Sequence, residues 1–250
     1  MTEIIRPTIH AADGTQKWVR TVGRPVLEDG KVIKVIGNIA DITERKRAED
    51  ALLETTERRK ESLTGTVQVI STFAEARDPY TAGHQRRSAD LAQAITGEMG
   101  LSPDRVEFIR VAARIHDIGK VAISAEILSK PAKLTEIEFS LVKGHPLAGY
   151  DILKDIEFPW PVADVVLQHH ERMDGSGYPN GLKGDDILLE AWILAVADVV
   201  EAIASHLPYR SALGIDTAME EISKDRGTLY HPEAVDACLK LFHEKGYSFD

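Results

Sequence analysis

The sequence predicts a mainly α fold, an all-α helical bundle preceded by a long connector helix and a short β-hairpin. From Ala74 onward the apolar residues recur at helical spacing, with no alternation of strands and helices and no internal repeat. Residues 42–76 carry mixed charges around a sparse apolar seam, as is typical of one long helix. Only residues 1–41 show the period-2 patterns of strands. We therefore expect three parts, at 1–41, 42–64 and 65–250.

The N-terminal part is expected to form a two-stranded hairpin. Residues 18–22 alternate like a half-buried strand, residues 28–30 signal a turn, and residues 32–39 supply the partner strand. Asp41 is placed to cap the next helix, with Glu44 as its capping-box partner. Because an isolated hairpin is marginally stable in water, we expect this segment to pack on another chain or to be poorly ordered. It could also be only an oligomerisation arm.

The connector helix has two interpretations. Charged helices between modules are usually solvated, but they can also form parallel coiled coils that pass a signal to an effector. A sparse apolar seam along this helix favours a homodimer. The seam consists of Leu52, Leu63, Val67, Ile70 and Phe73.

The bundle helices follow from caps and periodicity. Ser102 and Pro103 begin a helix on which Val106, Ile109 and His116 share one face with Ala113. Further helices are expected at 134–143, 146–154, 160–170, 188–205, 215–224 and 232–245.

Composition excludes several classes of protein. The 250 residues carry a net charge of -10, which argues against binding long nucleic acid through a basic surface. Cys238 is the only cysteine, so a disulfide within the chain and a multi-thiolate zinc site are excluded. The apolar stretch 191–204 is too short to span a bilayer and contains Asp198 and Glu201. With no apolar signal-peptide core at the N-terminus, we expect no membrane span and a cytoplasmic location.

A cluster of histidines and aspartates indicates a metal site. His116 and Asp117 are adjacent at the end of an apolar helix, where they could ligate one ion or bridge two. Asp198 lies within an apolar run, and a buried carboxylate needs a partner. That partner is either a metal shared with histidines or an arginine such as Arg114. Five of the nine histidines could meet in the bundle core: His84, His116, His145, His169 and His170.

Each of these residues also has an ordinary structural interpretation. His116 or His145 alone would more often be a hydrogen-bonded core histidine, and the pair His169-His170 could be a solvated helix end. Taken together, they favour a site of nitrogen and oxygen ligands without thiolate. Such ligands suit iron, manganese or zinc in a hydrolytic role.

From about Gly65 to Phe242 the chain resembles the HD-GYP family, the metal-dependent phosphodiesterase branch of the HD superfamily. Seven motifs in the order of that family carry the resemblance: residues 78–84, 116–120, 144–146, 169–172, 174–179, 181–184 and 196–198. The resemblance implies hydrolysis of cyclic di-GMP to linear pGpG and onward to GMP. It also implies an attacking water activated by two divalent ions.

The same resemblance implies residue roles. The metal ligands would be His84, His116, Asp117, His145, His169, His170 and Asp198. Asp117 would bridge the two ions, for which iron or manganese is favoured while zinc, magnesium and nickel stay open. Asp117 and Lys120 would be the catalytic residues, with Lys120 holding a substrate phosphate oxygen. The alternative for Lys120 is a lysine stabilised by the dipole at a helix C-terminus.

Substrate and partner contacts are also implied. Arg210 and Tyr178 would contact the substrate. The loop containing Asp174, Gly175, Gly177, Tyr178 and Pro179 would shape the site and contact diguanylate cyclase (GGDEF) domains, or it is simply a rigid turn.

The chain departs from the family pattern at two positions. Tyr80 stands where some members place a glutamate that holds a third ion, which favours a two-metal centre. Leu207 replaces the first basic residue of a phosphate-gripping run, although Arg210 is retained. Losing one charge-assisted contact would weaken substrate binding by roughly 1.5–3 kcal/mol.

The N-terminal segment resembles the last strands of a PAS sensor domain. The resemblance rests on residues 13–15, 18–19, 37–39 and 41–46, and it covers roughly the C-terminal third of that fold.

Three functions remain open from the sequence. The leading one is a cyclic di-GMP phosphodiesterase regulated by an N-terminal sensor. A related hydrolase could act on another cyclic dinucleotide, such as cyclic GMP-AMP. A catalytically weak receptor could bind the nucleotide or a cyclase partner. The seven intact ligands disfavour the receptor, whereas Leu207 mildly favours it.

Overall fold

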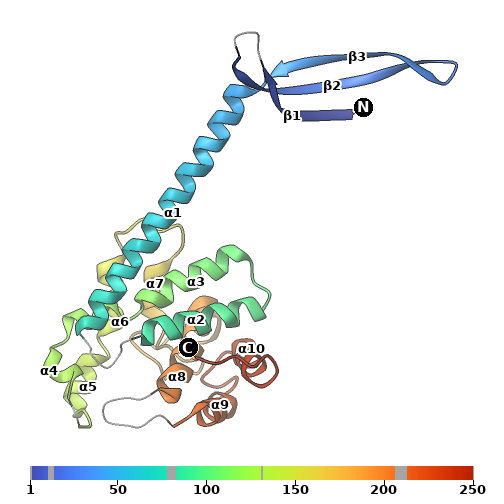
Figure 1. Cartoon of the computed structure of the whole chain (residues 1–250). Coiled ribbons are helices and arrows are strands. Elements are labelled where there is room, and N and C mark those ends of the chain that lie inside the picture. Colours follow the sequence, from blue (N-terminus) through green and yellow to red (C-terminus); the bar gives the residue numbers. More distant parts are fainter. Residues whose placement is uncertain (1, 11–13, 78–82, 131, 206–212, 250) are drawn as a thin grey trace. The chain divides into compact units, whose positions relative to one another are not determined.

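The computed structural model describes residues 2–10, 14–77, 83–130, 132–205 and 213–249. It confirms a mainly helical protein (Figure 1). The chain divides into two compact units, Met1–Leu63 and Thr64–Asp250.

The first unit contains a three-stranded antiparallel sheet in the order β1-β2-β3. Strand β2 (Gln16–Glu28) and strand β3 (Lys31–Asp41) form the predicted hairpin. Strand β1 (Thr2–His10) was not predicted and lies at the edge next to β2. Its register shifts between Arg6 and Ile9, around Pro7. Proline has no N–H to donate to a neighbouring strand, so within sheets it occurs at edges and irregularities. Its presence in this segment therefore argues against a strand when only the sequence is considered.

The hairpin continues into helix α1 (Thr43–Arg77) through hydrogen bonds at its first turn. The Asp41 carboxylate accepts the backbone N–H of Thr43 at 2.9 Å, as expected of a capping aspartate, although the helix begins one residue later than predicted. The Thr43 hydroxyl in turn accepts the backbone N–H of Trp18 at 2.9 Å, which ties the start of α1 to β2.

The C-terminal part of α1 belongs to the second unit. Val67 and Ala74 are buried there, and the Ser71 hydroxyl donates to the side chain of Gln85 at 2.8 Å. Leu52 and Phe73 are exposed. The apolar seam predicted for a dimer is therefore divided, because some of its residues pack within this chain.

The second unit is a helical bundle that contains every predicted helix, with ends that agree to within a few residues, together with a short helix at 125–128 and two 3₁₀ turns that were not predicted. In chain order, its elements are α2 (His84–Glu98), α3 (Pro103–Ile115), the 3₁₀ turn η1 (Ile118–Ala122), α4 (Ala125–Leu128), α5 (Glu136–Val142), α6 (His145–Leu153), α7 (Val162–Gln168), the 3₁₀ turn η2 (Gly184–Asp186), α8 (Leu189–Ala204), α9 (Ile215–Lys224) and α10 (Pro232–His243). Helix α3 starts as expected, since the Ser102 hydroxyl accepts the N–H of Arg105 at 3.4 Å.

Helix α8 packs mainly against α2 and α9 and also contacts α3, α7 and α10. Nearly every residue from Glu190 to Val200 is buried, so the apolar run around Asp198 is a core helix, as predicted. In the described part of the chain, no helix combines the length and the apolar character that crossing a membrane requires.

Candidate metal centre

Helix termini bring the predicted ligands together in the second unit. His84 is the first residue of α2 and His145 the first residue of α6, while His116 and His169 cap the C-termini of α3 and α7. Asp198 reaches the same place from the middle of α8. The other two predicted ligands, Asp117 and His170, directly follow two of these histidines. A site built from helix ends has fixed ligand positions, because each end is anchored in the core.

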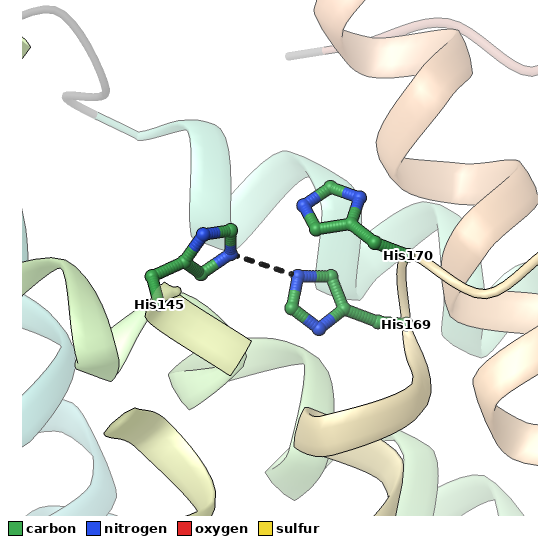
Figure 2. A group of neighbouring side chains, drawn as sticks. All are labelled: His145, His169 and His170. Atoms are coloured by element: carbon green, nitrogen blue, oxygen red, sulfur yellow. Dashed lines mark hydrogen bonds between the residues drawn. The ribbon is translucent and has the colours of Figure 1, made fainter. Parts of the chain in front are cut away.

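One group of ligand atoms consists of His145, His169 and His170, whose ligand nitrogens lie within 4.8 Å of one another (Figure 2). The Nδ1 atoms of His145 and His169 face the carbonyl oxygens of Val142 and Val166 at 2.8 and 2.6 Å. These contacts place the ring proton on Nδ1 and leave a lone pair on Nε2. The two Nε2 atoms lie only 3.2 Å apart (Figure 2).

That pair of nitrogens fits a bound cation. Two lone pairs facing each other repel unless a positive charge lies beside them. Two imidazoles bound to one ion at 2.0–2.1 Å would place their nitrogens about 2.8–3.4 Å apart for right-angled to tetrahedral geometry. The 3.2 Å separation of His145 and His169 lies in this range.

A second group consists of His84, His116 and Asp198. Asp198 Oδ1 lies 3.0 Å from His84 Nε2 and 3.6 Å from His116 Nε2. The Nδ1 atom of His116 faces the Ala113 carbonyl at 2.7 Å, which again leaves Nε2 available. The Arg114 alternative for Asp198 is wrong, because Arg114 pairs with Asp90 at 3.3 Å.

Asp117 lies between the two groups. Its Oδ1 is 3.3 Å from Nε2 of His145 in the first group. Its Oδ2 is 3.6 Å from Nε2 of His116 and 4.0 Å from Nε2 of His84 in the second. Each oxygen thus faces a different group, which is the arrangement that a carboxylate bridging two ions requires.

The charges around these groups favour a cation. Burial raises the pKa of Asp117, but the Lys120 ammonium, 2.8 Å away, and the neighbouring His116 outweigh it and hold the pKa well below the usual range. Burial also raises the pKa of Asp198, but hydrogen bonds from His116 and His84 outweigh this effect and hold that pKa well below its usual range. Both aspartates are therefore ionised.

The histidines of the first group are neutral. Burial, reinforced by neighbouring histidines, holds the pKa of His169 well below its usual range. Burial also lowers the pKa of His170 to about 3. Burial likewise disfavours a charge on His84, but Asp198 and Glu201 outweigh it and raise its pKa to about 10. The neutral imidazoles of the first group and the two ionised aspartates have the protonation states that metal ligands need. His84 and His116, whose pKa values are raised by the neighbouring carboxylates, would each release a proton when an ion binds.

Tyr178 and its loop cover one side of the first group. The Tyr178 ring lies 4.8 Å from the His170 ring, and its N–H donates to the His170 carbonyl at 3.3 Å. Lys143, which the sequence did not single out, places Nζ 5.5 Å from the Tyr178 ring. In the same loop, Asp174 accepts the N–H of Ser176 at 2.8 Å.

Glu171 anchors this loop, and sequence reasoning missed its role. Its buried carboxylate accepts the N–H groups of Asn180 at 2.7 Å and Leu182 at 3.0 Å. A Cβ at Gly177 would lie 2.4 Å from the Glu171 Cα, so only glycine fits this close approach. The predicted rigid turn is therefore built around a buried acid, which could have been suspected from a charged residue directly after the histidine pair.

Replacing Glu171 with glutamine should loosen the loop. The amide accepts one fewer backbone N–H, so we expect the free energy of unfolding to fall by about 1–3 kcal/mol. Urea unfolding measures this, with the exposed Glu157→Gln as the matched control. Equal stability of the two variants would show that Glu171 does not hold the loop.

Glu201 is a second residue whose role sequence reasoning missed. It was noted only as an interruption of the apolar stretch, yet it is buried and contacts Nδ1 of His84. Its spacing of three from Asp198 places both carboxylates on one face of α8, and this signal was available in the sequence. Arg210, Leu207 and Tyr80 lie outside the described residues.

A model of the HD domain family matches residues 68–234 of this chain. The chain belongs to the HD domain family. The matched HD domain includes all seven predicted ligands, from His84 to Asp198.

Curated relatives of this HD domain chain are phosphodiesterases by name. It is 42% identical over 189 residues to the cyclic di-GMP phosphodiesterase response regulator RpfG of Xanthomonas campestris, covering 75% of this chain and 49% of that protein. It is 42% identical over 180 residues to a cyclic di-GMP phosphodiesterase of Thermotoga maritima (71% and 49%). It is 37% identical over 178 residues to the 3'3'-cGAMP-specific phosphodiesterase 3 of Vibrio cholerae (71% and 38%). The chain thus spans about half the length of the first two relatives.

Solved structures share the fold. Bd1817, a HDG"Y"P protein from Bdellovibrio bacteriovorus, aligns with a TM-score of 0.57 at 18% identity, covering 76% of this chain and 64% of that one. The HD domain of the phosphodiesterase PgpH from L. monocytogenes aligns with a TM-score of 0.50 at 21% identity (71% and 99%). At these identities the likeness supports the HD fold alone.

Proposed function

We propose that this chain is a metal-dependent phosphodiesterase that hydrolyses cyclic di-GMP to pGpG or GMP. The observation that carries the proposal is the position of Asp117, whose two oxygens face different groups of histidines. A centre that holds two ions suits in-line displacement at phosphorus. The names of the relatives at 42% identity support the cyclic di-GMP substrate.

The protein residues would divide the work. His145, His169 and His170 would hold one ion, His84, His116 and Asp198 the other, and Asp117 would bridge them. Such ions lower the pKa of bound water and neutralise charge on phosphoryl oxygens. Lys120 would hold a substrate phosphate oxygen and stabilise negative charge that develops in the transition state. Tyr178 would contact the substrate beside His170.

The identity of the ions is part of the proposal. Imidazole and carboxylate ligands without thiolate favour iron or manganese over softer metal ions. Zinc, magnesium and nickel are alternatives. Affinity alone does not decide which ion is bound in a cell, so the metal must be counted in purified protein.

The remaining proposals concern regulation. The sheet of residues 1–41 would be the C-terminal part of a PAS sensor, and exposed Leu52 and Leu53 on α1 are available for a homodimer contact. The loop from Asp174 to Pro179 would contact a diguanylate cyclase domain. Within the described residues, Asp174 is 2.8 Å from the Ser176 N–H and shapes the turn itself.

A second substrate is favoured by a specific observation. One relative at 37% identity is named for 3'3'-cGAMP, so a mixed GMP–AMP cyclic dinucleotide is the alternative substrate. A receptor that binds without turnover is the third possibility.

Turnover and metal content, measured on one anaerobically purified sample, test the proposal. We expect about two iron or manganese ions per chain, with pGpG or GMP formed faster from cyclic di-GMP than from cyclic GMP-AMP. The reverse preference would identify the second substrate. Two ions without product would favour the receptor, and absence of metal would contradict the proposed centre.

A further inference from the structure

Glu201 is a buried carboxylate to which the proposed mechanism gives no role. Its side chain is only 1% exposed, and it projects from the same face of α8 as Asp198. A carboxylate at this depth is strongly unfavourable unless charged or hydrogen-bonding partners surround it. Its partners therefore indicate what it does.

Both oxygens of Glu201 are engaged, but by different groups. Oε1 accepts from the Arg87 Nε at 2.7 Å and from the Ser205 hydroxyl at 2.6 Å, with the Arg87 Nη2 at 2.6 Å from the same oxygen. Oε2 faces Nδ1 of His84. Because Oε1 is fixed by two side chains, Oε2 is held in one orientation toward the ring.

His84 differs from His116, His145 and His169 in what holds its ring. His116, His145 and His169 each place Nδ1 on a backbone carbonyl three residues earlier. His84 begins α2 as His145 begins α6, but its Nδ1 faces the Glu201 carboxylate and not a backbone carbonyl. The Glu201 carboxylate occupies the position that the carbonyl takes elsewhere.

We propose that Glu201, fixed by Arg87 and Ser205, is a positioning residue that secures one of the two metal ions by holding His84. Its carboxylate accepts the Nδ1–H of His84, so that Nε2, which lies 3.0 Å from Asp198 Oδ1, is the nitrogen left to bind an ion. This inference rests on the metal centre proposed above. Loss of Glu201 should affect only one of the two ions, because Glu201 contacts His84 in the second group and not the group of His145.

Glu201→Gln is a sharp test because it preserves size and reverses the hydrogen bond. With its carbonyl oxygen held by Arg87 and Ser205, the amide would present NH₂ to His84 Nδ1. The ring would then have to accept there and carry its proton on Nε2, where the ion should bind. We expect Mn²⁺ to bind at one site as in the wild type and 10–100-fold more weakly at the other.

A matched control lies on the same helix. Glu190 is also buried on α8 and is paired with an arginine, Arg105, at 2.7 Å, but it contacts none of the predicted ligands. Glu190→Gln should keep both Mn²⁺ sites. Isothermal titration calorimetry of the metal-free protein with Mn²⁺ alone measures the affinities of both sites. ¹⁵N shifts of the metal-free variants report the tautomer of His84, which a purely structural role would not change.

The outcomes separate the two proposals. A wild-type protein that binds no Mn²⁺, Fe²⁺ or Zn²⁺ would contradict the metal centre itself. Two normal sites in Glu201→Gln, or equal weakening of both sites, would overturn the role of Glu201 while leaving the centre intact. If circular dichroism shows that the single variant is unfolded, Arg87→Gln with Glu201→Gln removes both charges of this pair, and the same selective loss is expected.

Discussion

Replacing Asp117 with asparagine should leave a folded protein that binds metal weakly and does not hydrolyse cyclic di-GMP. The amide keeps the volume of the side chain but loses the negative charge whose two oxygens face His145 and His116 at 3.3 and 3.6 Å. We expect turnover to fall at least about 10³-fold, beyond the 10²–10³ typical of losing one oxyanion donor. Elemental analysis should find at most about one ion per chain.

The control for this variant is Asp151→Asn, an exposed aspartate paired with Lys154 at 2.7 Å. It should keep full metal content and turnover, because exposed ion pairs contribute little to stability. If Asp117→Asn retained two ions and full activity, Asp117 would not be a bridging ligand. The two histidine groups would still stand as metal sites.

Replacing Lys120 with methionine should separate catalysis from metal binding. The Lys120 ammonium lies 2.8 Å from Asp117, at the edge of the candidate centre. If it stabilises charge on a phosphate oxygen, its loss should lower kcat by about 10²–10³ while the metal content stays unchanged. Steady-state turnover and elemental analysis on the same sample measure both quantities.

Lys130→Met is the matched control, because Lys130 is also partly buried against a carboxylate, Glu138, at 2.7 Å. It should turn over cyclic di-GMP like the wild type. Loss of metal from Lys120→Met in proportion to the loss of activity would instead assign Lys120 to holding Asp117 in place.

Sequence patterns predicted the elements of the bundle well because local chemistry determines them. Ser102 and Pro103 mark the start of α3, and the apolar run around Asp198 marks a helix buried on all sides. Strand β1 escaped prediction because its pairing with β2 is a contact between segments, and Pro7 interrupts its pattern.

The candidate site was predictable in its residue types and not in its contacts. His116 and Asp117 carry a signal in their adjacency, so the sequence alone points to a metal. The contact between His84 and Glu201 joins residues 117 positions apart, and no local pattern encodes it. The backbone N–H groups that donate to the Glu171 carboxylate lie in a loop. The path of this loop depends on the close approach of Gly177 to the backbone of Glu171.

The way the histidine rings are held also bears on which sequence changes the site can tolerate. A backbone carbonyl is present whatever side chain its residue carries, so the orientations of His116, His145 and His169 survive substitution at Ala113, Val142 and Val166. His84 depends on a side chain, and a single substitution at Glu201 can change its orientation. Natural variation within the centre should therefore alter the affinity of one ion far more readily than that of the other.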